Sequence, residues 1–94
     1  MGNIKPIKFG PRSFYWTDDV DHNKSFIDSN KNYLEAIYDT KGYIYLSEIY
    51  DSFGVAWDPE DENICWNNKQ FDKLAFVVAH QAGDSEWYIY PKKN

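Results

Sequence analysis

The chain has 94 residues, a formal net charge of −5 and one cysteine, and 19% of its residues are aromatic. This length suits one domain, and a hydrophobic content of 43% argues against disorder. The single Cys65 excludes an internal disulfide, which is typical of a reducing compartment. We therefore expect a single domain over 1–94, with 1–12 as an extended arm. With neither a secretory signal pattern nor a membrane-spanning apolar run, we expect it in the cytoplasm.

The N-terminal segment is predicted to be extended. Pro6 and Pro11 oppose a helix there, since proline fixes φ and lacks an N–H. The aromatic run 14–16 is predicted to form a short strand. Residues 17–21 are predicted to form a turn that ends in residue types that cap helices.

The longest predicted element is a helix over residues 22–40. One stripe of the helix follows a 3.6-residue period and consists of Phe26, Asn30, Tyr33, Leu34, Ile37 and Tyr38. Asp21 is the predicted N-cap. Lys41 and Gly42 supply the cation and the left-handed stop that end many helices.

A second, shorter helix is predicted over residues 47–53. It follows a β-favouring run at 43–45, Ser47 is its predicted cap, and Gly54 is its predicted stop. Residues 58–62 are predicted to form an acidic surface loop because Pro59 favours a turn.

The C-terminal part is predicted to be an antiparallel hairpin, 74–79 paired with 86–90, because six apolar residues are followed by a Gly- and Asp-containing loop. Leu74, Phe76 and Val78 share one face, Val77 lies on the other, and Pro91 is predicted to end the ladder. These elements define an α+β fold with a small antiparallel sheet. The predicted core consists of Tyr33, Leu34, Ile37, Leu46, Ile49, Phe53, Trp66 and Phe76.

Charge is distributed unevenly along the chain. Residues 13–68 contain twelve acidic side chains against three lysines. A basic surface for nucleic acid is therefore not expected, whereas an acidic surface attracts a basic protein partner. The predicted partner-binding residues combine the two acidic segments with nearby aromatic anchors: Tyr15, Trp16, Asp18, Asp19, Asp21, Trp57, Asp58, Glu60, Asp61 and Glu62.

We find no catalytic or cofactor motif. His22 and His80 lie in predicted surface turns and Cys65 lacks a local nucleophile pattern, so no catalytic residue is assigned. The acidic loop at 58–62 lacks the central glycine of a calcium loop, and one cysteine with two distant histidines gives no zinc ligand pair. Phosphate-binding glycine loops are absent. We expect a protein without enzymatic activity, bound metal or cofactor.

Residues 46–54 read L-S-E-I-Y-D-S-F-G, and a tryptophan follows twelve residues later; the matched positions are Leu46, Ser47, Glu48, Tyr50, Asp51, Gly54 and Trp66. This pattern resembles uncharacterised proteins of phages and prophages of low-GC Gram-positive bacteria, over about residues 22–90. Cys65 departs from it, since a glycine often precedes that tryptophan. The resemblance implies a small accessory protein of a phage or mobile element, without known catalytic residues.

Three functions follow as hypotheses. The leading one is a module that binds, and by binding inhibits, a host or defence-system protein in the bacterial cytoplasm, with no membrane or nucleic-acid partner. The second is a minor structural or assembly component of a phage particle. The third is a small-ligand binder, for instance of a nucleotide, at the interface of a homo-oligomer.

Overall fold

The computed structural model describes residues 6–59, 64–67, 69 and 73–93, and its longest element is helix α1, Val20–Lys41. The Asp19 side chain caps this helix by accepting a hydrogen bond from the His22 N–H at 3.1 Å. Gly42 ends it with a φ of 81°, and its N–H donates to the Tyr38 carbonyl. The predicted helix is confirmed. Asp21 is not the cap; it lies two residues further on, in the first turn, where a carboxylate interacts favourably with the positive end of the helix dipole.

The buried face of α1 differs from the predicted stripe. Its buried residues are Asn23, Ile27, Leu34 and Tyr38. Tyr33, expected in the core, is 59% exposed, and Ile37 is half-buried. The predicted stripe was too wide because only part of it faces the core; Tyr33 and Ile37 line the open space between α1 and α2.

The main sheet has three antiparallel strands in the order β1 (Ile7–Phe9), β5 (Trp87–Lys93) and β4 (Leu74–Ala79). β4 and β5 form the predicted hairpin, with Val77 opposite Tyr90. Pro91 does not end the ladder: β5 continues to Lys93, with Pro91 opposite Phe76. A proline lacks an N–H, so it is tolerated in a strand where no neighbouring strand needs that hydrogen bond. Pro91 lies in such a place, because among the described residues β1 pairs with β5 only at 87–89.

Burial alternates along these strands. Leu74 is buried, Phe76 and Val78 pack against the core, and Val77 is 42% exposed, so the predicted faces of the hairpin are confirmed. In the N-terminal segment the strand is 7–9, where Ile7 and Phe9 are buried. Residues 14–16 were wrongly predicted to be a strand: Phe14 and Tyr15 form a turn, and Trp16 has no regular secondary structure.

Helix α2 spans Leu46–Ser52 and follows β2, Tyr43–Tyr45, directly. Its N-cap position is Tyr45, whose N–H donates to the Glu48 carboxylate at 3.4 Å. Ser47 is therefore inside the helix and not its cap, because the chain turns from strand to helix two residues earlier than predicted. Gly54 follows the helix with a φ of 69°.

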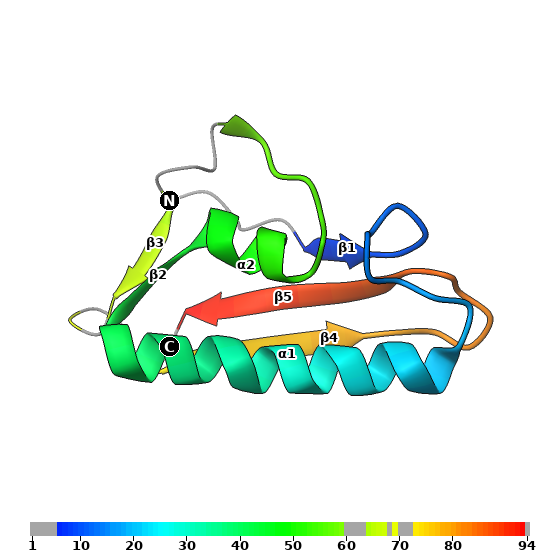
Figure 1. The fold of residues 1–94 in the computed structure, drawn as a ribbon, viewed down its shortest axis with the longest axis horizontal. Coiled ribbons are helices and arrows are strands. Elements are labelled where there is room, and N and C mark those ends of the chain that lie inside the picture. Colours follow the sequence, from blue (N-terminus) through cyan, green and yellow to red (C-terminus); the bar gives the residue numbers. More distant parts are fainter. Residues whose placement is uncertain (1–5, 60–63, 68, 70–72, 94) are drawn as a thin grey trace.

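β2 pairs with β3, Cys65–Asn67, in a separate two-stranded sheet that places the fully buried Trp66 opposite Ile44. Figure 1 shows α1 running along the molecule beside β4, and α2 lying across from it towards β1. One core joins the inward residues of the three-stranded sheet to both helices. In the described part of the chain no helix combines the length and apolarity needed to cross a membrane.

Candidate partner-binding groove

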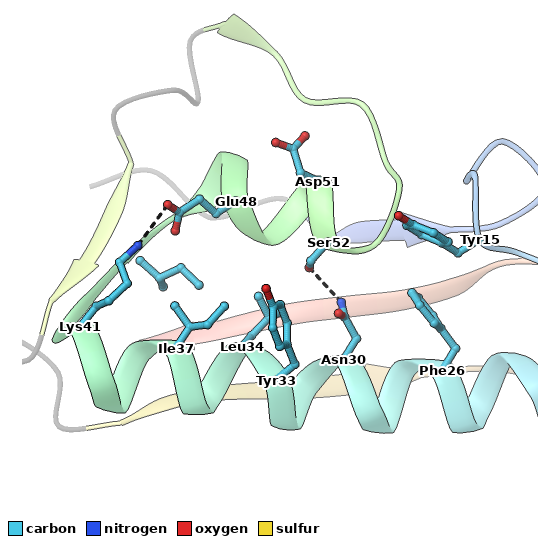
Figure 2. A pocket seen from close by; sticks show the side chains of 11 residues that line it. Tyr15, Phe26, Asn30, Tyr33, Leu34, Ile37, Lys41, Glu48, Asp51 and Ser52 are labelled. Atoms are coloured by element: carbon cyan, nitrogen blue, oxygen red, sulfur yellow. Dashed lines mark hydrogen bonds and ion pairs between the residues drawn. The ribbon is translucent and has the colours of Figure 1, made fainter.

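An open groove of about 680 Å³ runs between α1 and α2, and we call it the α1/α2 groove (Figure 2). Leu34 and Ile44 belong to its apolar lining, and Tyr15 and Lys41 also border it. The wall from α1 is mainly aromatic and apolar, whereas the wall from α2 is polar and acidic. The α1 wall consists of Phe26, Asn30, Tyr33 and Ile37, and the α2 wall of Glu48, Asp51 and Ser52.

Aromatic rings hold one end of the groove in shape. Phe26 stacks on the buried Phe9 with ring centroids 5.4 Å apart, and Tyr15 lies 5.2 Å from Phe26 on its other side. Gly54 permits this position of Tyr15, because a Cβ there would lie 2.8 Å from the Tyr15 Cδ2. The Phe14 N–H also donates to the Gly54 carbonyl at 3.1 Å. Tyr15 is therefore fixed, yet 47% exposed.

A polar contact links the two helices near the middle of the groove. The Asn30 Nδ2 donates to the Ser52 Oγ at 2.8 Å, and that hydroxyl donates to the Ile49 carbonyl at 2.6 Å (Figure 2). The Asn30 amide and the Ser52 hydroxyl thus have hydrogen-bond partners, and their contact connects the two helices at this point. Tyr33, one turn further along α1, remains largely exposed on the same wall.

Charged side chains border the other end. Lys41 Nζ lies 3.5 Å from the Glu48 carboxylate and 4.8 Å from the centroid of the Tyr43 ring. Asp51 stands on the rim and accepts a hydrogen bond from the Trp57 indole at 3.1 Å. With two carboxylates against one lysine, the groove carries a negative charge, mostly at Asp51, because Lys41 offsets Glu48.

The structure brings together only some of the predicted partner-binding residues. Tyr15 lines the groove, and Trp57 reaches its rim through Asp51. Trp16 and Asp18 instead line a separate hollow of about 260 Å³ against the hairpin turn at 83–85. Asp19 is occupied as the helix cap, and Asp21 is exposed on the first turn of α1.

The second acidic segment lies elsewhere. Asp58 lines a hollow of about 200 Å³ with residues of β1, whereas Glu60, Asp61 and Glu62 lie outside the described residues. Figure 1 places the start of α1 and the segment after α2 far apart along the molecule. Among the predicted residues that the structure describes, Asp18 and Asp58 thus line different hollows.

Sequence reasoning missed Tyr33, Glu48 and Asp51 as groove residues. The available signal was the breadth of the helix stripe: apolar residues over two faces indicate that a second element covers the helix. Asp51 and Glu48 belong to the short second helix, whose position against the first could not be read from spacing alone.

The residues considered for chemistry have structural contacts. The His80 ring stacks on Trp87 at 3.8 Å, and its Nε2 lies 2.9 Å from the Asp84 carbonyl. The half-buried Cys65 thiol lies 3.3 Å from the Trp66 carbonyl. Within the described ranges, no three His, Cys, Asp or Glu side chains gather as metal ligands would. Burial, helped by nearby Asp84 and Glu86, raises the pKa of Tyr88 above its ordinary value.

Comparison of the chain with known proteins was negative: no family model, curated protein or solved structure matches it. The resemblance to phage and prophage proteins therefore stays a prediction.

Proposed function

We propose that this protein is a non-catalytic binding module, encoded by a phage or mobile element, that binds and inhibits a host or defence-system protein in the bacterial cytoplasm. The observation that carries the proposal is the α1/α2 groove, in which exposed tyrosines face carboxylates. The provenance comes from the resemblance of residues 22–90 to phage and prophage proteins.

The groove has the chemical character of a protein-binding surface. Tyrosine combines a large apolar ring with a hydroxyl and is enriched among residues that dominate binding energy. Tyr33 is 59% and Tyr15 is 47% exposed, and Tyr15 is held by its neighbours before any partner binds. A side chain that is already ordered loses little entropy on binding, which favours affinity.

The charge of the groove specifies the partner. Asp51 on the rim, together with the excess of acidic residues over 13–68, favours a segment that carries lysine or arginine beside an apolar side chain. The apolar side chain would contact Tyr33 and Ile37, and the cation would lie near Asp51. The partner is therefore a protein with a basic, partly apolar surface.

The test uses matched variants of the groove. Wild-type protein and variants Tyr33→Ala and Asp51→Asn are used to capture proteins from host lysate, and the captured protein is then purified for titration calorimetry. The controls are Val20→Ala and Asp39→Asn, which change exposed residues of α1 that do not line the groove.

Tyr33→Ala should weaken binding at least tenfold. Asp51→Asn should weaken binding severalfold and lower the dependence of binding on salt. Both controls should bind like the wild type. Equal affinity for all five proteins would show that the partner binds elsewhere and would refute the groove as the site.

A second function is favoured by the size of the groove. A volume of about 680 Å³ falls within the range of roughly 300–1,000 Å³ that holds small ligands, and Tyr15, Phe26 and Tyr33 offer rings on which a base could stack. Thermal unfolding with a panel of nucleotides distinguishes the two functions, because a small ligand raises the melting temperature by mass action. A shift that Tyr33→Ala abolishes would favour the ligand-binding function.

A further inference from the structure

The three-stranded sheet has one face covered by the helices and one face open. We call the open side the outer sheet face and define it by Lys8, Ala75, Val77, Ala79, Tyr88 and Tyr90, which alternate with the inward residues of β1, β4 and β5. Val77 is 42% and Tyr90 is 39% exposed. Among the described residues, both helices join the core on the opposite face.

The middle of this face, at Val77 and Tyr90, is uncharged, whereas Lys8 lies at its β1 edge, opposite Tyr88 and near the turn end. Along β4 the outward residues are small, whereas along β5 they are tyrosines. The register places Val77 directly opposite Tyr90 and Ala79 opposite Tyr88. Neighbouring aromatic and aliphatic side chains on a sheet form a continuous apolar surface, which is the kind of surface that binds another protein.

The two ends of the hairpin carry opposite charges. The open end holds the exposed Lys73, and the register places Lys92 there, opposite Ala75 of the outer face. The turn end holds Asp84 and Glu86. About six residues separate these ends, roughly 20 Å at the rise of a β-strand. The charge of the hairpin therefore changes sign along its length, from basic at the open end to acidic at the turn end.

We propose that a second copy of this chain packs on the outer sheet face, with the two hairpins antiparallel about a two-fold axis. In this arrangement each basic end lies against the acidic end of the other copy, and the neutral tyrosine and valine surfaces meet in the middle. A parallel arrangement would place like charges together at both ends. The charge pattern of the face is thus complementary to itself, as a two-fold interface requires.

The dimer is expected to be weak. The face is that of a small hairpin with one short additional strand, less than the roughly 800 Å² that each partner buries in a standard interface. Each copy also carries a net charge of −5, which opposes association. We expect a dissociation constant of about micromolar or weaker.

Dimerisation through this face leaves the α1/α2 groove accessible, because the helices lie on the other side of the sheet. The dimer would then present two grooves, and a partner with repeated binding segments would bind with increased avidity. The dimer itself does not depend on the proposed function of the groove.

Sedimentation velocity of the full chain, from roughly 10 µM to 1 mM, tests the proposal. The expected result is a concentration-dependent change from the 11.1 kDa monomer to twice that mass. Val77→Lys places a charge in the neutral middle and should weaken the dimer at least tenfold. Val77→Thr, the uncharged β-branched control, should stay within about threefold. Circular dichroism confirms that both variants fold.

The charged ends are tested by reversal. Lys73→Glu and Glu86→Lys each remove the charge difference at one end, so each should weaken the dimer severalfold, and the double variant should bind no more tightly than either single variant. Asp51→Asn in the groove should leave the dimer unchanged. A monomer at all concentrations, a dimer indifferent to Val77→Lys, or a double variant that associates as tightly as the wild type would overturn the proposal.

Discussion

Replacing Ile27 by alanine is expected to destabilise the protein by about 3 kcal/mol, because this side chain is buried where α1 meets the sheet. Ile27 is 1% exposed and borders Val78 and Trp87. The substitution removes three carbon atoms, each worth about 0.8 kcal/mol of burial. The cavity left behind adds to this loss, which places the total within the 2–5 kcal/mol observed for such truncations.

The matched control is Tyr33→Ala on the same helix. Tyr33 is 59% exposed, so its removal should change the free energy of unfolding by less than about 0.5 kcal/mol. The half-buried Ile37 should give an intermediate loss on replacement by alanine. The three losses of stability, compared with one another, show which face of α1 is buried.

The assay is urea unfolding, followed by circular dichroism at 222 nm for the helices and by tryptophan fluorescence for the core. A loss of about 3 kcal/mol should also lower the melting temperature by roughly 10–20 °C in a domain of this size. A larger loss for Tyr33→Ala than for Ile27→Ala would show that α1 buries the stripe predicted from the sequence and would refute the packing described above.

Further predictions concern single positions elsewhere in the fold. Gly54→Ala should destabilise by about 1–3 kcal/mol in the same urea assay, because φ is 69° and the new Cβ would lie 2.8 Å from Tyr15; an unchanged midpoint would contradict this. Asn23→Ala should cost about 1–3 kcal/mol, since the buried amide donates to the Thr17 carbonyl at 2.7 Å and accepts from its N–H at 3.0 Å; Thr17→Ala, which keeps both backbone groups, should cost less. Burial raises the pKa of Tyr88, so its contribution to stability is complete below its ordinary pKa of about 10 and is lost as the pH rises through the higher folded value. Tyr88→Phe should therefore reduce the loss of stability at alkaline pH, and identical profiles would contradict this.

Local chemistry explains which parts of the fold the sequence predicted. The long helix could be placed because its period and its glycine stop are encoded in adjacent residues, and Gly42 indeed has a positive φ. The C-terminal hairpin could be placed because its two strands are separated by only a short loop. Boundaries were less accurate, since Asp19 and Asp21 are equally good cap residues by composition, and only the path of the chain selects Asp19.

Contacts between distant segments could not be predicted in this way. The pairing of β2 with β3 joins residues about twenty positions apart, and β1 pairs with β5 across nearly the whole chain. Nothing in the three residues of either short strand specifies such a partner, because a strand of that length satisfies its backbone equally well in many pairings.

The groove, too, could be predicted only in part from the sequence. The sequence by itself determined that α1 carries more apolar residues than one buried face needs, and that acidic residues crowd the middle of the chain. Only the tertiary structure decided that Tyr33 is exposed beside α2, that Asp51 stands on the rim opposite, and that Asp18 and Asp58 line different hollows. The physical reason is that burial of Ile27, Leu34 and Tyr38 in the core sets the rotation of α1 about its axis, and their core partners are far away in the sequence.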